Sequence, residues 1–251
     1  MRIWVVVEAM LGVDDITAGY GEVDVVHDFS MRLDDGEIAC VVGPNGSGKS
    51  TILKSIVGIV KPRRGRVVLD GYDITGLEPH ETLRKGICLL PQGRTAFPML
   101  TVIENLQMGA YIVKDSGEVG QRLQRAYDLF PVLAERRNDT ANKLSGGEMA
   151  MLCIARALMS NPKVILLDEP SLGLAPKVTD HVYEKISEIN EKGASVLIVE
   201  QNVRKALKTT DYAYVISLGR KKFEGKSEAV ANDDRLRELY LGGGEHESKK
   251  Q

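Results

Sequence analysis

VVGPNGSGKST, residues 41–51, is the stretch that decides the fold of this chain. It fits the spacing G-x-x-x-x-G-K-[ST], with Lys49 and Ser50 in the last two positions. A short apolar run, residues 38–42, overlaps its start, and a stretch of helical character, residues 52–58, follows and stops at a glycine. Strand, glycine-rich loop and helix therefore come in the order that a phosphate-binding loop requires.

The chemistry of this loop suits a nucleoside triphosphate. Its glycines let backbone N–H groups face an anion, and the helix start adds unpaired donors and a positive dipole end. Lys49 is expected to reach the β- and γ-phosphates, and the Ser50 hydroxyl to bind Mg²⁺. The alternative, a glycine-rich turn before a helix with a surface lysine, leaves the full motif unexplained. The residues predicted to surround the nucleotide are Gly43, Pro44, Asn45, Gly46, Ser47, Gly48, Lys49, Ser50 and Thr51.

The remaining apolar runs predict an α/β fold. Residues 86–90, 164–167 and 195–199 are continuous apolar segments, typical of buried parallel strands, and helical patterns separate them. Such alternation predicts a mostly parallel sheet with helices on both faces. Residues 93–160 differ in character. They contain a helical stripe that ends at a proline and is interpreted as core packing, so we expect a helical insertion there. The stripe consists of Leu123, Ala126, Tyr127 and Phe130.

Composition excludes several classes of function. The chain has 251 residues and a formal net charge of −2, so it shows no electrostatic footprint for nucleic acid or anionic lipid. No apolar run reaches the roughly 18–20 residues that span a bilayer, so any membrane role would be that of a peripheral subunit. The three cysteines and four histidines lack metal-site spacing and are interpreted as ordinary reduced or polar side chains of a cytosolic protein.

The two ends of the chain carry separate predictions. Residues 1–9 are expected to form a strand or an extra segment ahead of a second methionine, Met10, and not a secretory signal. Residues 243–251 are polar and are expected to be a disordered tail.

Two carboxylates end the apolar run at 164–167. Because ligands bind beyond the carboxyl ends of parallel strands, Asp168 and Glu169 are expected near the phosphates. Asp168 would hold Mg²⁺ and Glu169 would polarise the attacking water. The alternative is a strand-end turn before Pro170, which the phosphate loop makes the weaker interpretation.

A second helix start, LSGGE at residues 144–148, also resembles an anion site. Ser145 and Glu148 have the spacing of a capping box, which would be a sufficient structural explanation by itself. However, Gly146 and Gly147 would each cost roughly 1 kcal/mol relative to alanine in a helix, so we expect something to approach this backbone closely. The chain would then have two phosphate-binding helix starts but only one lysine loop.

Together these motifs are similar to those of the ATP-binding subunits of ABC transporters. GPNGSGKST, Gln92, LSGGE, VILLDEP and SLGLAP carry the resemblance, which extends from about residue 11 to residue 242. It implies a P-loop NTPase fold with an N-terminal antiparallel β subdomain and a helical subdomain at about 93–160, within one domain at 1–242. It also implies that ATP lies between the lysine loop of one subunit and Ser145, Gly146 and Gly147 of another.

The resemblance assigns further roles that the residues alone leave open. Tyr20 lies between two glycines and by position suits a turn or an adenine-stacking ring equally; the resemblance implies stacking. Gln92 would sense the γ-phosphate and contact Mg²⁺, and residues 171–176 would cross the seam between two subunits.

Finer features resemble the ATPases of branched-chain amino acid importers and of related urea and amide importers. These are LLPQGRTAFPMLTVIENL, SLGLAP, VLIVEQN and the late YLG. The resemblance implies the smaller of two ATPases at the cytoplasmic face of the membrane. Its partners would be a second ATPase, integral-membrane permeases and, indirectly, an external solute-binding protein.

Two positions depart from the common family pattern. Gln201 stands where most ABC ATPases have a histidine that contacts the γ-phosphate; an amide can bond there but cannot become cationic. The importer branch commonly shares this feature. Met149 follows LSGGE where glutamine is usual, and it is interpreted as a tolerated surface change.

Other functions remain open at this stage. They are an export ATPase, for instance for lipopolysaccharide; a soluble ABC ATPase in iron–sulphur assembly, DNA repair or translation; and a partner subunit that hydrolyses ATP weakly. Export ATPases keep the switch histidine, nucleic-acid versions have basic surfaces or long arms, and intact Lys49, Asp168 and Glu169 disfavour a weak ATPase.

Overall fold

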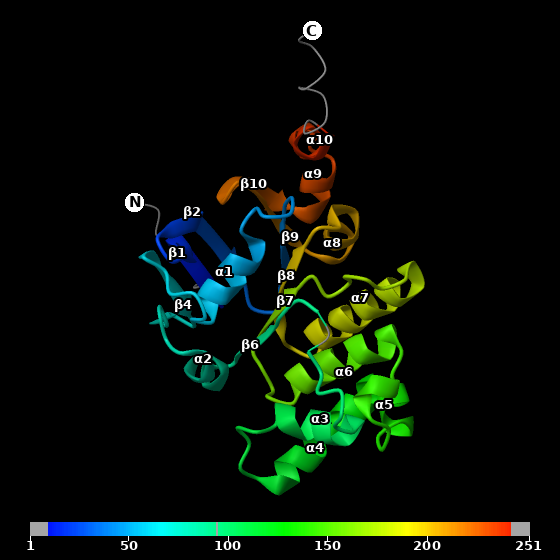
Figure 1. The fold of residues 1–251 in the computed structure, drawn as a ribbon. Coiled ribbons are helices and arrows are strands. Elements are labelled where there is room, and N and C mark those ends of the chain that lie inside the picture. Colours follow the sequence, from blue (N-terminus) through cyan, green and yellow to red (C-terminus); the bar gives the residue numbers. More distant parts are fainter. Residues whose placement is uncertain (1–9, 94, 242–251) are drawn as a thin grey trace, which may run out of the picture.

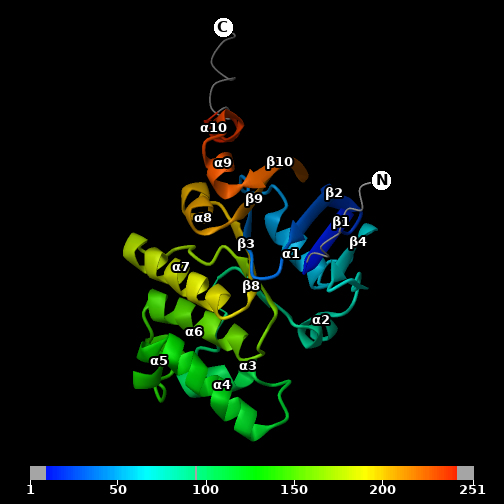
Figure 2. The ribbon, with the colours of Figure 1, turned by 180° about the vertical axis from the view of Figure 1, so that it is seen from behind.

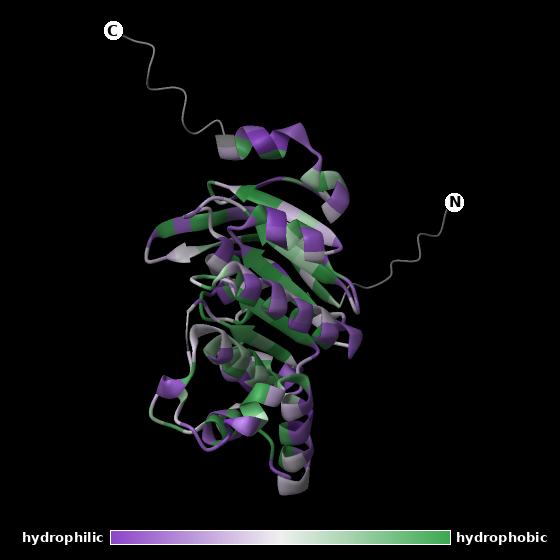
Figure 3. Cartoon of the chain, turned by 90° about the vertical axis from the view of Figure 1, so that its right-hand side faces the viewer, coloured by the Kyte–Doolittle hydropathy of each residue, from purple (hydrophilic) through white to green (hydrophobic). Residues whose placement is uncertain are grey.

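The apolar runs of the sequence form a six-stranded sheet at the centre of the molecule. The computed structural model describes residues 10–93 and 95–241 (Figure 1). The strand order is β10-β9-β3-β8-β7-β6, and all neighbours are parallel except the antiparallel pair β10 and β9. Figure 3 shows these strands as a mostly hydrophobic layer. The strands are β3 (Ile38–Val42), β6 (Ile87–Leu90), β7 (Val164–Asp168), β8 (Ser195–Glu200), β9 (Tyr212–Ser217) and β10 (Arg220–Lys226).

A second, antiparallel sheet lies beside the first and has the order β2-β1-β4-β5. Its strands are β1 (Leu11–Tyr20), β2 (Val23–Leu33), β4 (Arg64–Leu69) and β5 (Tyr72–Asp73). The sequence pattern alone did not reveal the long hairpin of β1 and β2, and only the family resemblance implied this subdomain. The observed sheet confirms it.

Alternation along the buried strands divides the core into two parts. Cys40 and Val42 of β3 face the helical side, whereas Ala39 and Val41 face α1 and the small sheet. This period of two is expected of a sheet covered on both faces. Helices outside the insertion are α1 (Lys49–Ile56), α2 (Pro79–Lys85), α7 (Pro176–Glu191), α8 (Val203–Thr209), α9 (Ser227–Ala231) and α10 (Asp234–Leu241).

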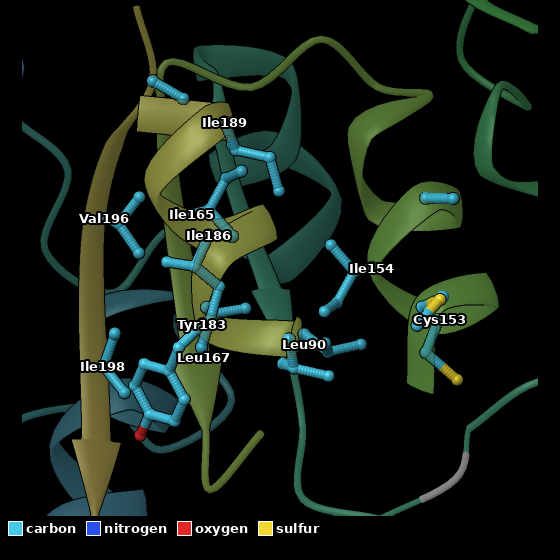
Figure 4. Close-up of a cluster of buried hydrophobic side chains, with 14 of the residues drawn as sticks. Leu90, Cys153, Ile154, Ile165, Leu167, Tyr183, Ile186, Ile189, Val196 and Ile198 are labelled. Atoms are coloured by element: carbon cyan, nitrogen blue, oxygen red, sulfur yellow. The ribbon is translucent and has the colours of Figure 1, made fainter. Parts of the chain in front are cut away.

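The helical insertion lies between β6 and β7 and extends away from the sheet (Figures 1 and 2). Within the predicted stripe, Ala126 and Phe130 are buried, and the half-exposed Leu123 and Tyr127 pack against the core. The interpretation of this stripe as core packing is therefore confirmed. Figure 4 shows the core where the insertion meets the sheet. The insertion contains α3 (Val102–Gly109), α4 (Ser116–Leu129), α5 (Pro131–Glu135), a 3₁₀ turn (Ala141–Lys143) and α6 (Gly146–Leu158).

The predictions for residues 1–9 and 243–251 fall outside the described residues. The domain boundaries, 1–242 with an insertion at about 93–160, stay a prediction. No helix within the described part of the chain is long and apolar enough to cross a bilayer.

Candidate functional site

The glycine-rich loop connects the carboxyl end of β3 to the start of α1. Gly48 is the N-cap of α1 and has φ of +101°, a conformation that favours glycine because it lacks a Cβ. No side chain caps this helix start, so its amide donors remain available to an anion. The strand, loop and helix predicted from the motif are therefore present.

Lys49 is buried against its own loop. Its Nζ donates to the carbonyl oxygens of Gly43 at 2.9 Å and Pro44 at 3.1 Å, and it lies 3.8 Å from Oε1 of Glu169. Burial lowers the pKa of Lys49, and the carboxylates of Glu169 and Asp168 act in the opposite direction. The Lys49 ammonium therefore lies where the phosphate oxygens of a bound nucleotide would replace these two carbonyl oxygens as hydrogen-bond acceptors.

The two strand-end carboxylates lie opposite the loop. Asp168, the last residue of β7, accepts a hydrogen bond of 2.9 Å from the Ser50 hydroxyl. Glu169 has the left-handed φ of +48°, which is costly for a residue with a side chain. The Gln92 side-chain amide donates to Oε2 of Glu169 at 2.9 Å. Four residues from three separate segments therefore converge.

Burial raises the pKa of both carboxyl groups above their ordinary values. For Glu169, desolvation is the largest cause; Lys49 lowers the pKa, while Glu200 and Asp168 raise it further. For Asp168, desolvation again dominates, and the hydrogen bond from Ser50 opposes it. A raised pKa suits a carboxylate that accepts a proton in catalysis.

A cavity of about 370 Å³ opens between these segments. The Ser47 hydroxyl is buried beside it and has no hydrogen-bond partner among the described residues, as expected where a phosphate oxygen would complete the loop. This orphaned group shows that the residues fit a phosphate ligand, and the Ser50, Asp168 and Gln92 oxygens suit Mg²⁺. The cavity is lined by Val25, Asn45, Gly46, Ser47, Gly48, Lys49, Ser50, Thr51, Gln92, Glu169, Leu172 and Gln201.

The second helix start lies outside this cavity. Ser145 caps α6 by accepting from the Glu148 amide at 3.3 Å, and the Glu148 carboxylate accepts from the Ser145 amide at 2.7 Å. The capping box is therefore confirmed. A Cβ on Gly147 would lie 2.6 Å from the Val178 side chain. The close neighbour that we expected beside this glycine is therefore, at least in part, helix α7 of the same chain. None of the described residues that line the cavity comes from 145–147.

One prediction about α6 is wrong. Met149 is 9% exposed and belongs to the core, so the methionine is a buried packing residue and not a surface substitution. It follows the capping box by one position, where the helix turns its apolar face inward.

Tyr20 lies at the end of β1 and is 50% exposed. The Lys54 ammonium, one turn beyond the loop on α1, lies 5.8 Å from the ring centroid. The ring does not line the cavity, but Val25 of the same hairpin does. An exposed ring beside the loop is compatible with stacking on a base.

The sequence did not reveal two features of the site. The turn between β9 and β10 contacts the loop, because the Gly219 amide donates to the Ser47 carbonyl at 3.1 Å. Glu200, at the end of β8, is buried and lies next to Gln201. A lone carboxylate closing an apolar strand was the available signal for Glu200; nothing in the pattern indicated the turn.

Known proteins carry the same set of elements. The family model described as ABC transporter matches residues 26–172. The chain belongs to the ABC transporter family. A branched-chain amino acid transport ATP-binding protein of Pseudomonas aeruginosa, BraG, is 41% identical, with 93% of this chain and 100% of the relative covered. The lipopolysaccharide export ATP-binding protein LptB of Haemophilus influenzae is 37% identical, with 93% and 98% covered.

Among solved structures, an ATP-binding cassette of an ABC transporter in its ADP conformation has a TM-score of 0.83 and 31% identity. The similarity covers 93% of this chain and 98% of that cassette. The fold is therefore that of an ABC ATPase, and the chain is an ATPase that binds nucleotide. ABC ATPase subunits work as dimers with membrane permeases.

Proposed function

We propose that this ABC ATPase drives an importer for branched-chain amino acids or similar small solutes, from the cytoplasmic side of the membrane. The convergence of Lys49, Gln92 and Glu169 on one cavity supports the hydrolytic part of the proposal. Similarity to BraG and the residue Gln201 support the importer part.

In the proposed reaction, ATP occupies the cavity with its phosphates on the loop. Lys49 leaves the Gly43 and Pro44 carbonyl oxygens and neutralises the β- and γ-phosphates. Bound Mg²⁺ would supply charge neutralisation between the phosphates, held through Ser50, Gln92 and Asp168.

The water that attacks the γ-phosphate is proposed to be polarised by Glu169. Its raised pKa makes this carboxylate a better proton acceptor than an exposed glutamate. The Gln92 amide holds one carboxylate oxygen, which leaves the other to the water. Gln201 lines the same cavity and is proposed to donate a neutral hydrogen bond to the γ-phosphate.

The site is proposed to be completed by a second ATPase subunit. In one chain the Ser145–Gly147 helix start and the loop do not share a cavity, so the Ser145, Gly146 and Gly147 donors are available for ATP on a partner. The adenine would stack on Tyr20. Closure on ATP and opening after hydrolysis would move the bound permeases.

A groove of about 280 Å³ on the other side of Gln92 is the proposed permease contact. Phe97 is 45% exposed and Met108 47% exposed at its rim, so the groove presents apolar side chains to a partner. Pro91 lines this groove and precedes Gln92, whose side chain bonds Glu169, so a partner seated here would act close to the site.

Export is the second candidate, because LptB covers as much of the chain as BraG does. The family resemblance assigns a histidine to export ATPases where this chain has Gln201, which favours import.

The decisive experiment purifies the tagged chain from its native membranes and reconstitutes the assembly in vesicles. We expect co-purified permeases and ATP-dependent uptake of radiolabelled leucine or a related solute. A Glu169→Gln assembly should take up none, while the matched exposed variant Glu184→Gln transports normally. Recovery of soluble partners alone would overturn the importer proposal, and release of lipopolysaccharide without uptake would favour export.

A further inference from the structure

Glu200 is a buried carboxylate that the proposed mechanism does not use. It is the last residue of β8, whose other residues form a continuous buried run, and it is only 2% exposed. Removing a charged group from water costs several kcal/mol unless hydrogen bonds replace the lost hydration. The contacts of Glu200 should therefore explain how a charged group is tolerated in the core.

The Glu200 carboxylate accepts hydrogen bonds on both oxygens. Oε1 accepts from the hydroxyl groups of Ser171 at 2.6 Å and Tyr183 at 3.0 Å. Oε2 accepts from the backbone amides of Gln201 at 3.1 Å and Asn202 at 3.3 Å. All four partners are donors, as an ionised carboxylate requires.

These partners belong to three separate parts of the site. Ser171 begins the segment that the resemblance places at the subunit seam, two residues after Glu169. Tyr183 lies on α7, and Figure 4 shows its hydroxyl pointing toward the carboxyl end of β8. Gln201 lines the phosphate cavity. One side chain thus joins the seam segment, a core helix and the cavity wall.

A second connection makes this arrangement more rigid. The Glu169 amide donates to the Val199 carbonyl at 2.9 Å, so the backbone next to Glu200 also fixes the strained Glu169. A conformation with φ of +48° persists only where its surroundings hold it.

We propose that Glu200 is a positioning residue for ATP hydrolysis, which sets Glu169 and Gln201 against the cavity and ties both to the seam segment at Ser171. The inference rests on the proposed hydrolytic role of Glu169. It adds a route by which contact with a second subunit at the seam would act on hydrolysis.

The position of Glu200 gives this role a signature. Glu200 does not itself line the described phosphate cavity, but it bonds the backbone of Gln201, which does. Its loss should therefore lower kcat more than it changes KM for ATP, a split that a general loss of folded protein would not produce.

The test measures kcat and KM for ATP for the full chain in its purified assembly. Glu200→Gln should lower kcat roughly 10- to 100-fold while KM changes by less than about threefold. Glu200→Asp keeps the charge on a shorter side chain, so it should recover part of the kcat that Glu200→Gln loses.

Ser171→Ala and Tyr183→Phe remove single donors and should lower kcat less than Glu200→Gln does. Their effects should not add to those of Glu200→Gln, because all three changes break the same cluster. Matched controls on α7 are Glu184→Gln, an exposed carboxylate, and Ser187→Ala, whose hydroxyl donates to the Tyr183 carbonyl within the helix; both should keep wild-type kcat.

Wild-type kcat in a folded Glu200→Gln protein would overturn the inference. If that variant does not fold, Ser171→Ala decides, and an unchanged kcat there overturns it equally. Glu169→Gln separates the two proposals. If the Glu169→Gln protein hydrolyses ATP normally, the proposed hydrolytic role of Glu169 is wrong. If Glu169→Gln is inactive but Glu200→Gln has normal activity, only the proposed role of Glu200 is wrong.

Discussion

The starts of α1 and α6 both carry the marks of an anion site, yet they are built in opposite ways. At α1 the N-cap is Gly48, which offers no capping side chain, and Lys49 supplies a cation directly behind the loop. At α6 the Ser145 hydroxyl and the Glu148 carboxylate close a complete capping box. The first start is open to a ligand, whereas the second carries a cap from its own chain that bonds the Ser145 and Glu148 amides.

If two subunits share one nucleotide, this difference suits the two helix starts to different tasks. The α1 start combines uncapped amide donors with a cation, so we expect it to bind phosphate without help from a second subunit. The α6 start is stable without a ligand because of its cap, and it offers the free first-turn amides of Gly146 and Gly147. It is therefore suited to dock onto a nucleotide that another subunit already holds.

Replacing Lys49 should produce the largest effect. Lys49→Ala removes the only cation that lines the described cavity, so ATP turnover should fall roughly 100- to 1,000-fold or more. Steady-state hydrolysis and binding of a fluorescent ATP analogue measure this. Lys61→Ala, an exposed lysine paired with Glu78, is the control and should have no effect. Similar losses in both variants would contradict the comparison.

Lowering the pH should have the second-largest effect on ATP turnover. Because the hydrolytic role needs ionised Glu169, and burial raises the pKa of this carboxyl, kcat should fall as the pH drops through that raised pKa. Below it, kcat should decline about tenfold for each pH unit. The measurement is kcat at saturating ATP across the pH range, with folding checked at each pH. A profile that is flat down to the ordinary pKa of glutamate would contradict the assignment.

Enlarging Gly147 should test what the α6 glycines do. Gly147→Ala places a Cβ against Val178, and such overpacking typically costs about 1–3 kcal/mol, partly offset by better helix propensity. Urea denaturation measures the free energy of unfolding. Adding Val178→Ala should recover part of the loss if the clash is its cause. Loss of ATP-driven dimerisation that persists in the double variant would show that the glycine also serves the ligand.

Removing the α6 cap should have the smallest effect on stability. Ser145→Ala should cost about 1 kcal/mol of unfolding free energy, as expected for an N-cap serine. Thr101, which forms the same capping box at α3, provides the matched variant Thr101→Ala. Both should lose similar stability, but only Ser145→Ala should weaken ATP-driven dimerisation, measured by light scattering. Equal dimerisation in the two would reduce the α6 start to a structural cap.

The sequence predicted the parts of the fold that local patterns determine. Buried runs such as β3 and β7 were found because a continuous apolar segment has few alternatives, and the capping box at Ser145 because its spacing is local. The hairpin of β1 and β2 escaped the pattern, since its burial is interrupted by bulges that break the period of two. Only the family resemblance implied it.

The candidate site divides in the same way. Gln92 was selected by resemblance, and only the fold shows that its side chain bonds Glu169. Met149 was misjudged because the local sequence around LSGGE does not show which face of the following helix is buried. Glu200 was missed because its significance lies in contacts with residues 29 and 17 positions away, which no local pattern encodes.

The contact between the β9–β10 turn and the phosphate loop has a consequence for labelling. Leu218 at this turn is 84% exposed and would ordinarily be chosen to carry a dye or an affinity tag. Its neighbour Gly219 donates to the Ser47 carbonyl and accepts from the His27 amide at 2.9 Å. A bulky label at this turn would therefore distort the phosphate-loop cavity from the outside, whereas Glu184 on α7 is exposed and is not among the residues that line this cavity.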